Sequence, residues 1–370
     1  MIVFFFPYEL PIKLGVAVVT LAFFFNALNQ ILVGLFQKSL RMDKVSIAEI
    51  AGRIVLIGGI IAAIKLKSGL MGIMVTTVIS GAINFLSNYL FSLKFARIKL
   101  AFDKDVWLQI VKKIWPLAIT ITLNLIYLKA DTLILSLIKS QSEVGIYGAA
   151  YKVIDVFTAI PFMFAGVVLP IITFAWAENR ERFKNIFQKS FDATVILALP
   201  IVIGAQFTAE RVMTLVAGKE FAAAGPVLKI LIMAAGIIFL GSMFAHAIIA
   251  IDRQRKIIGA YVFTSITAFF GYLFFIPTYS FFGAAWVTVY SELAIALASV
   301  FIFWKYAKFL PNFKIFLKSF LASLLMGATL YFLPSFNLFL TLAAAIIIYA
   351  GALYLFKGLK FVSFDSNYNS

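Results

Sequence analysis

Eleven apolar stretches of the sequence are long enough to cross a membrane as helices, and this pattern limits the fold more than any other feature. A helix needs about 20 mostly apolar residues to span about 30 Å of hydrocarbon. The chain is 63% apolar and only 13% charged, whereas soluble domains are about 45–50% apolar and about 25% charged. The sequence therefore predicts an all-α, polytopic membrane protein with about eleven transmembrane helices. The predicted spans are 14–36, 46–66, 70–93, 115–138, 146–175, 190–208, 227–250, 257–277, 282–304, 314–334 and 336–356.

The sequence is poor in side chains that bind metals or act as nucleophiles. It has no cysteine and one histidine, His246, which excludes thiol catalysis, disulfides and zinc sites built from cysteine and histidine. The net charge of +16 would suggest a nucleic acid partner for a soluble protein. In a membrane protein, it indicates instead which connections face the cytoplasm. We expect no metal site, no cofactor, no nucleic acid partner and no enzymatic activity.

The basic residues fall mainly in alternate connections between the predicted spans. One set of connections, which includes the C-terminal end, carries 22 lysines and arginines, and the other set carries seven. Connections rich in lysine and arginine face the cytoplasm. We therefore expect a multi-pass protein of the cytoplasmic membrane, with its C-terminus in the cytoplasm and its N-terminus on the outer side.

An internal repeat relates the third and ninth predicted spans. At an offset of 211 positions, seven of 26 residues are identical, and a basic turn, a span and a short outer turn precede both segments. Such repeats build many transporters from two helical bundles around a central cavity. The alternative is coincidence between two apolar helices. The identical pairs are Gly72 and Gly283, Thr77 and Thr288, Val78 and Val289, Ser80 and Ser291, Leu86 and Leu297, Lys94 and Lys305, and Ala96 and Ala307.

The repeat predicts a two-bundle transporter whose first bundle is incomplete. We expect residues 1–99 to form three helices of that bundle, residues 100–114 to form an amphipathic linker at the membrane interface, and residues 115–309 to form a six-helix bundle. Residues 310–370 are predicted to form an appended two-helix hairpin and a cytoplasmic tail. We also expect three helices upstream of Met1, because an odd number of added spans would return the N-terminus to the cytoplasm.

Two segments have the pattern of amphipathic helices that lie in the cytoplasmic membrane interface. The segment 104–115 places Trp107 and its apolar neighbours on one face, and the segment 180–191 places Phe183 and Phe187 opposite basic residues. Simple anchoring by aromatic and basic side chains explains this pattern. A strap between two moving bundles is the alternative interpretation of the first segment.

Four ionisable side chains lie inside predicted spans at a similar depth. The span 115–138 contains Lys129 and Asp131, and the next contains Lys152 and Asp155. An ionisable side chain at mid-membrane costs about 2.5–3.5 kcal/mol, so such residues face a cavity or a partner. We expect Asp131 to pair with Lys152 and Lys129 to pair with Asp155, either as a neutral structural clasp or as part of a transport cavity. Asn124 is a further cavity candidate on the same span.

Other polar side chains inside spans are also candidates for function. Glu292 has no basic partner three or four residues away, so it suits coupling to protons or sodium, or it packs in its protonated form. Glu49 and Arg53 are spaced as an intrahelical ion pair, and Arg53 also suits an anionic headgroup. Asn84 and Asn88 suit a sugar-lined or water-filled lumen, although interhelical hydrogen bonds explain them equally well. The first span adds Asn26, Asn29 and Gln30.

Several stretches together resemble one family of transporters. WPLAITITLNLIYLKAD at 115–131, EVGIYGAAYKVID at 143–155 and the segment 161–170 resemble the seventh and eighth helices of polysaccharide flippases, and QKSLRMD at 37–43 resembles the loop after their fourth helix. The resemblance extends over nearly the whole chain. The family exports lipid-linked oligosaccharides and shares its superfamily with the multidrug and toxin extruders.

The resemblance implies a MATE-like, two-bundle fold and a function in cell-surface polysaccharide biosynthesis. It implies that an undecaprenyl-diphosphate-linked glycan moves from the cytoplasmic to the outer leaflet by alternating access, with membrane lipids and a glycan polymerase machinery as partners. Members have twelve or fourteen helices with both ends cytoplasmic, whereas this chain lacks the first three. Lys129, Asp131 and Lys152 match charged positions of the family's seventh and eighth helices.

Two other functions remain open at this stage. A cation-coupled multidrug extruder of the same fold would need an uncompensated acidic cavity, and Glu292 fits that need. A membrane-embedded glycosyltransferase or polymerase would need acidic or histidine clusters in outer loops, where only Glu9, Glu143, Glu210 and Glu220 occur.

Overall fold

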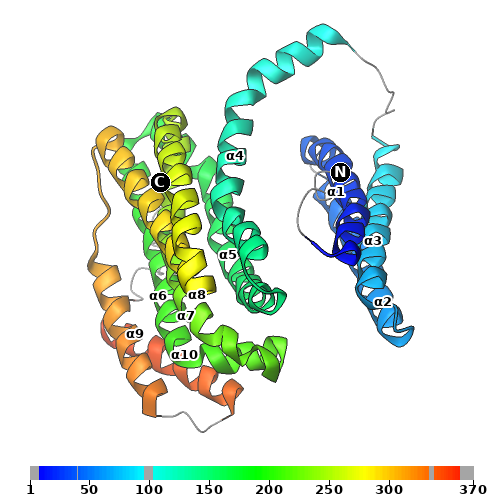
Figure 1. Ribbon diagram of the computed structural model, residues 1–370. Helices are drawn as coiled ribbons and strands as arrows, with labels where there is room; N and C mark the ends of the chain where they lie inside the picture. The colour runs from blue at the N-terminus through cyan, green and yellow to red at the C-terminus, as the bar shows by residue number, and fades with distance from the viewer. Residues whose placement is uncertain (1–7, 40, 96–102, 333–336, 359–370) are drawn as a thin grey trace. The chain divides into compact units, whose positions relative to one another are not determined.

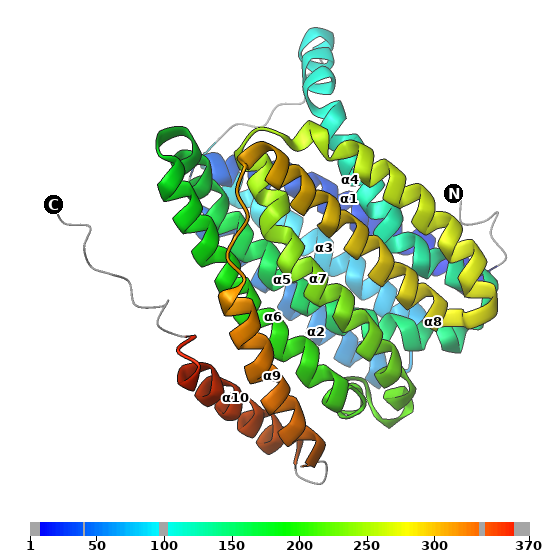
Figure 2. The same ribbon diagram turned by 90° about the vertical axis from the view of Figure 1, so that its left-hand side faces the viewer.

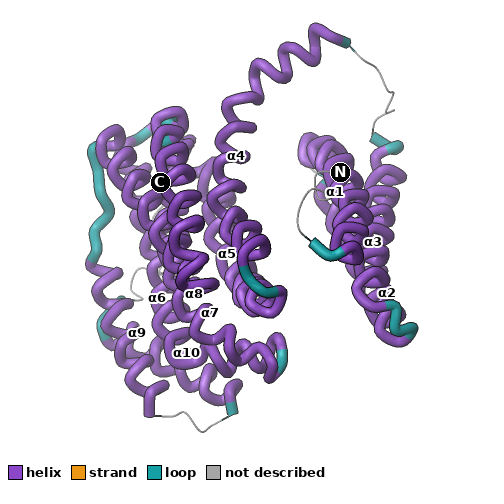
Figure 3. The backbone as a smooth tube through the Cα atoms, viewed as in Figure 1, coloured by secondary structure: helices purple, strands orange, loops and turns teal. Residues whose placement is uncertain are grey.

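The computed structural model describes residues 8–39, 41–95, 103–332 and 337–358. These residues form helices and loops, and no strand occurs among them (Figure 3). They contain ten α-helices, shown in Figure 1. The helices are α1 (Leu10–Lys38), α2 (Met42–Lys65), α3 (Gly69–Ser92), α4 (Lys104–Ile138), α5 (Gln141–Glu178), α6 (Arg180–Ala217), α7 (Gly225–Ala250), α8 (Ile258–Ala307), α9 (Lys314–Phe332) and α10 (Leu338–Leu355).

Helix α8 contains two of the predicted spans. Its backbone breaks at Ser280, where φ is 50° and ψ is −135°, and the chain folds back so that the halves pack together. A Cβ added to Gly271 would lie 3.1 Å from the Cγ1 of Val287 in the other half. Each of the eleven predicted spans therefore has a helical counterpart in the described part of the chain. The prediction of an all-α, polytopic membrane protein is confirmed.

Length and composition support this conclusion for most of the helices. Nine helical segments of the described residues are long and apolar enough to cross a membrane, and one of them, Gln254–Ala307, includes both halves of α8.

The chain divides into two compact units, Met1–Lys112 and Lys113–Ser370. We call them the N-terminal unit and the C-terminal unit.

The two predicted interfacial segments are not separate helices. The segment 104–115 continues without a break into α4, and 180–191 forms the first turns of α6. Asn179 begins α6, because its side-chain oxygen accepts hydrogen bonds from the backbone N–H groups of Glu181 and Arg182. An N-cap of this kind satisfies free donors at a helix start.

The prediction that the phenylalanines of α6 face the membrane interface is wrong. Phe183 and Phe187 are 1% and 0% exposed, and the ring of Phe187 stacks on Phe303 of α8 with centroids 4.6 Å apart. Phe244 of α7 packs edge-on against Phe187. The same apolar face that suits a lipid interface also suits a helix-packing contact, and here the contact lies inside the bundle.

Helices α9 and α10 form a hairpin that packs on α6 (Figure 2). The Tyr349 hydroxyl on α10 donates to the backbone carbonyl of Ile196 on α6 over 2.8 Å, and it lies 2.7 Å from the Ser319 hydroxyl on α9. Interhelical hydrogen bonds of this kind fix helix packing in lipid. One tyrosine therefore joins three helices of the C-terminal unit.

In the N-terminal unit, α3 packs against both α1 and α2. Small residues allow the approach to α2, since a Cβ on Gly52 would lie 3.2 Å from the Ser80 carbonyl oxygen. The Ser80 hydroxyl donates to the Gly52 carbonyl over 2.9 Å. Small residues and serine hydroxyls commonly bring membrane helices together, and here they leave room for a cavity on one side of the contact.

Candidate functional site

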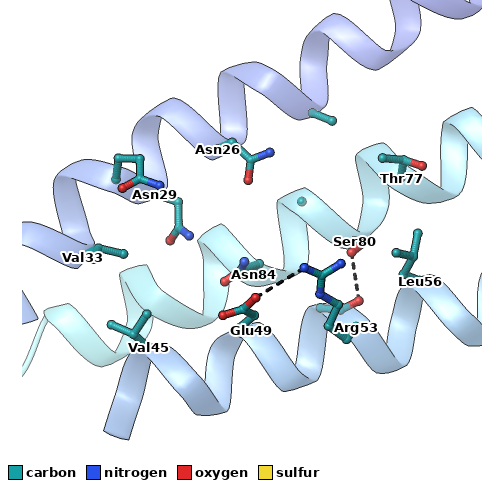
Figure 4. Close-up of a pocket in the computed structure, with 14 residues that line it drawn as sticks. Asn26, Asn29, Val33, Val45, Glu49, Arg53, Leu56, Thr77, Ser80 and Asn84 are labelled. Atoms are coloured by element: carbon teal, nitrogen blue, oxygen red, sulfur yellow. Dashed lines mark hydrogen bonds and ion pairs between the residues drawn. The ribbon is translucent and has the colours of Figure 1, made fainter. Parts of the chain in front are cut away.

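The N-terminal unit contains a cavity of about 400 Å³ between α1, α2 and α3 (Figure 4). Most of its lining is polar although all three helices are apolar overall. Half of the polar lining residues carry side-chain amides, which both donate and accept hydrogen bonds. The polar lining residues are Asn26, Asn29, Gln30, Glu49, Arg53, Thr77, Ser80 and Asn84.

One ion pair belongs to this lining. Arg53 donates to the Glu49 carboxylate over 3.4 Å across one turn of α2, as the spacing of the two residues predicted. Both side chains remain more than half exposed. A guanidinium has five N–H donors, so the pair leaves donors and acceptors available to a ligand in the cavity.

Asn88 is hydrogen-bonded to two residues that line the cavity. It was a candidate cavity residue, but it is 0% exposed and does not line the cavity. Its amide donates to the side-chain oxygens of Asn29 over 2.8 Å and of Asn84 over 3.0 Å. Because both acceptors line the cavity, Asn88 holds the amides of α1 and α3 in place. Its own side-chain oxygen has no hydrogen-bond partner among the described residues.

A cationic cluster lies on α4 and α5 of the C-terminal unit. Lys129 Nζ is 3.8 Å from one Asp155 oxygen, and Lys152 Nζ is 3.7 Å from the other. Lys129 also lies over the Tyr151 ring, 4.7 Å from its centroid, in the geometry of a cation–π contact. The predicted pair of Lys129 with Asp155 is therefore present. We call Lys129, Lys152, Asp155 and Tyr151 the lysine cluster.

The predicted pair of Asp131 with Lys152 is wrong. Asp131 is fully buried, and its carboxylate accepts hydrogen bonds from the Tyr147 hydroxyl over 2.6 Å and from the Thr132 hydroxyl over 3.1 Å. Because Lys129 and Asp131 are two positions apart on α4, they point to different faces of the helix. Asp131 faces the core of the bundle, and Lys129 lies on the exposed side. Residue counting along the sequence gives the positions of Lys129 and Asp131 on α4, but it does not give their directions around the helix.

Tyr147 is a site residue that the sequence analysis missed. It is fully buried, and its ring packs against Tyr151 with centroids 5.4 Å apart. The spacing of four residues between the two tyrosines was the available signal, because it places both on one face of α5. Tyrosine in an apolar run looks like an interface anchor, whereas here its hydroxyl satisfies a buried carboxylate.

Glu292 is buried in the second half of α8, with 6% of its surface exposed. One carboxylate oxygen has no hydrogen-bond partner among the described residues. Tyr261 and Tyr272 are close enough to interact with it electrostatically. The side chain of Asn124, the remaining candidate, lies outside the described residues.

No group of three histidine, aspartate or glutamate side chains in the described residues could hold a metal ion. His246 contacts the Ser242 carbonyl over 2.8 Å on its own helix and lies beside Phe162.

Comparison with known proteins places this arrangement in a family. The sequence profile described as "Polysaccharide biosynthesis protein" matches residues 7–226, which include the cavity of the N-terminal unit and the lysine cluster. The chain belongs to that family. No curated protein matches the sequence.

The fold is similar to that of a solved transporter structure. The structure of lipid II flippase MurJ in its inward closed conformation superposes with a TM-score of 0.79 at 16% sequence identity, covering 94% of this chain and 75% of that chain. At this identity, the likeness establishes the fold alone, which is that of a MurJ-like transporter.

Proposed function

We propose that the protein moves a lipid-diphosphate-linked oligosaccharide from the cytoplasmic to the outer leaflet of the cytoplasmic membrane, for cell-surface polysaccharide synthesis. The observation that carries this proposal is an amide-lined cavity of about 400 Å³ inside helices that are apolar overall. The family description and the likeness to a lipid II flippase support it. The transported molecule is not altered chemically, and the C-terminus lies in the cytoplasm.

The cavity suits the oligosaccharide part of such a substrate. Sugar hydroxyls donate and accept hydrogen bonds, and so do the side-chain amides of Asn26, Asn29 and Asn84. The Glu49–Arg53 pair adds a charged acceptor and charged donors, which form stronger hydrogen bonds than neutral groups. A neutral, hydroxyl-rich ligand would satisfy this lining without leaving a charge unpaired.

The lysine cluster suits the diphosphate. Lysine ammonium groups bind phosphate as point charges, and Lys129 and Lys152 carry two such groups within reach of one carboxylate. Their side chains are 55% and 85% exposed, so an anion can approach them. We thus assign sugar binding to the cavity and phosphate binding to the lysine cluster.

We further propose that Glu292 couples transport to protons or sodium. A buried carboxylate with a free oxygen gains a partner by taking up a proton or a cation. The same observation favours a second candidate function, cation-coupled drug extrusion. The two are distinguished by substrate, since an extruder of cationic drugs would gain nothing from Lys129 and Lys152.

A flipping assay with the full chain in proteoliposomes tests the proposal. A fluorescent polyprenyl-diphosphate oligosaccharide is supplied, and its transfer is followed by lectin accessibility from outside. We expect transfer by the wild-type chain, slower transfer by an Asn26→Ala, Asn84→Ala double variant, and wild-type transfer by Gln109→Ala, an exposed amide on α4 outside the cavity. Transfer equal to that of protein-free vesicles would contradict the proposal, and so would export of a cationic dye alone.

A further inference from the structure

Asp155 lies between two lysines and is bound firmly by neither. Its oxygens are 3.8 Å from Lys129 and 3.7 Å from Lys152, which is longer than a direct hydrogen bond between charged groups, about 2.7–2.9 Å. Its side chain is 43% exposed. The carboxylate is therefore shared, loosely held and open to exchange.

Among the described residues, Asp155 is also the carboxylate that pairs with both lysines. Neither lysine forms another ion pair among the described residues. The nearby Asp131 carboxylate is already occupied, because Tyr147 and Thr132 donate to its two oxygens. The cluster of two ammonium groups and one shared carboxylate thus has a net charge of +1.

The cluster lies far from the connected ends of both helices. Lys129 lies nine residues before the end of α4 at Ile138, and Lys152 lies eleven residues after the start of α5 at Gln141. At 1.5 Å per residue, both are about 14–17 Å from the helix ends, near mid-membrane depth. Charges at that depth are unfavourable unless a counter-ion accompanies them.

We propose that Asp155 is a placeholder anion. In the empty transporter, its carboxylate occupies the position that one phosphate of the substrate takes between Lys129 and Lys152, and the arriving diphosphate displaces it. This inference rests on the proposed function and adds a specificity determinant to it. Throughout the exchange, one anion replaces another, and the Tyr151 ring keeps Lys129 in place when the carboxylate leaves.

The exchange explains how the cluster selects diphosphate over monophosphate. A monophosphate carries one or two negative charges, so it gains little over the single charge of the Asp155 carboxylate that it displaces. A diphosphate brings more charge and more acceptor oxygens, so it engages both lysines after the carboxylate has turned away. Asp155 therefore weakens the binding of all anions, and it weakens the binding of singly phosphorylated lipids most.

Binding measurements on the purified full chain test this inference. The probes are farnesyl diphosphate and farnesyl monophosphate, and titration calorimetry gives both Kd values. We expect Asp155→Asn to tighten the binding of both probes and to lower the preference for the diphosphate by about threefold, the size expected of an exposed ion pair. Asp155→Glu, which keeps the charge, should retain most of the wild-type preference.

Glu178→Gln is the matched control. Glu178 ends α5 and pairs with Arg182 over 3.3 Å at 49% exposure, so its loss removes a similar ion pair away from the cluster. We expect wild-type Kd values for this variant. Weaker diphosphate binding by Asp155→Asn, or an unchanged preference, would overturn the placeholder role. If Asp155→Asn does not fold, Asp155→Ser gives the same test with a smaller neutral side chain.

A Lys129→Ala, Lys152→Ala double variant separates this inference from the proposed function. If the double variant loses diphosphate binding while Asp155→Asn leaves the preference unchanged, the lysines bind substrate and the placeholder role alone is wrong. If the wild-type chain binds neither probe, or binds both as the double variant does, the phosphate site of the proposed function is wrong as well.

Discussion

The two units of the molecule differ in how deeply their helices are buried and in how their polar side chains are hydrogen-bonded. In the C-terminal unit, 61% of the residues in the most apolar 18-residue stretch of Lys219–Ala250, which contains α7, are buried. The buried carboxylate of Asp131 accepts hydrogen bonds from two hydroxyl groups. In the N-terminal unit, only 6% of the residues in the most apolar 18-residue stretch of α3 are buried, and amide side chains line an open cavity. The C-terminal unit is therefore held together by an extensive buried core, and its lysine cluster lies on an exposed side, whereas the polar groups of the N-terminal unit line a cavity. The difference indicates where substitutions should affect stability and where they should affect binding.

The largest contrast should come from aromatic side chains. Phe187→Ala removes a fully buried ring from the core of the C-terminal unit, and we expect a loss of about 3–5 kcal/mol in the free energy of unfolding. Phe23→Ala, at an N-terminal-unit position that is 70% exposed, should change it by less than about 0.5 kcal/mol. Thermal unfolding in one detergent measures both. Equal losses would contradict the contrast between the two units.

The two aspartates of the C-terminal unit give the next contrast. Tyr147→Phe removes the hydroxyl that donates to buried Asp131 over 2.6 Å, and we expect a loss of about 1–3 kcal/mol of stability. Asp155→Asn breaks an exposed, shared pair, so the loss should be below about 1 kcal/mol. Denaturant unfolding of both variants checks the order. A larger loss for Asp155→Asn would show that the lysine cluster holds the fold.

Transport should depend on the lysines more than stability does. We expect Lys129→Ala combined with Lys152→Ala to slow glycolipid flipping by at least about tenfold, because two charge-assisted contacts to phosphate are lost. The control is Lys104→Ala combined with Lys112→Ala, two exposed lysines near the start of the same helix. Flipping rates in proteoliposomes measure the effect. Wild-type flipping rates in the Lys129→Ala, Lys152→Ala variant would mean that the lysine cluster has only a structural role.

The smallest effect should come from a single cavity amide. Asn84→Ala removes one hydrogen-bonding group from the lining, so glycan affinity should fall by about threefold. Asn88→Ala, at a buried position that holds Asn29 and Asn84, should lower both affinity and stability. Parallel binding and unfolding measurements separate the two. If Asn88→Ala left affinity unchanged, the positioning role of Asn88 would be wrong.

The membrane fold could be predicted from the sequence because the length of an apolar run can be counted along the sequence without knowing how the helices pack. All eleven spans have helical counterparts in the described residues, since a helix that crosses hydrocarbon must be long and apolar. Direction around each helix is harder to predict, because lipid and protein core are equally apolar. Phe187 therefore looked like an interface anchor and is a core residue.

The candidate site could be predicted in part for the same reason. Depth followed from residue counting, so Lys129 and Asp155 were correctly placed together. Asp131 was assigned to Lys152, because a charge pattern gives no weight to a neutral tyrosine such as Tyr147. The two predicted spans 257–277 and 282–304 were also correct, because the backbone of α8 breaks between them at Ser280.

Photo-crosslinking with a labelled substrate tests the central claim most directly, namely that neutral amides take the glycan and lysines take the diphosphate. Two polyprenyl-diphosphate oligosaccharides are needed, one with a diazirine on the terminal sugar and one with a diazirine on the first isoprene beside the diphosphate. The account predicts that the sugar probe labels α1–α3 peptides near Asn26 and Asn84, and that the other labels α4 and α5 near Lys129 and Lys152. Labelling of the same peptides by both probes, or no labelling that unlabelled substrate competes away, would contradict it.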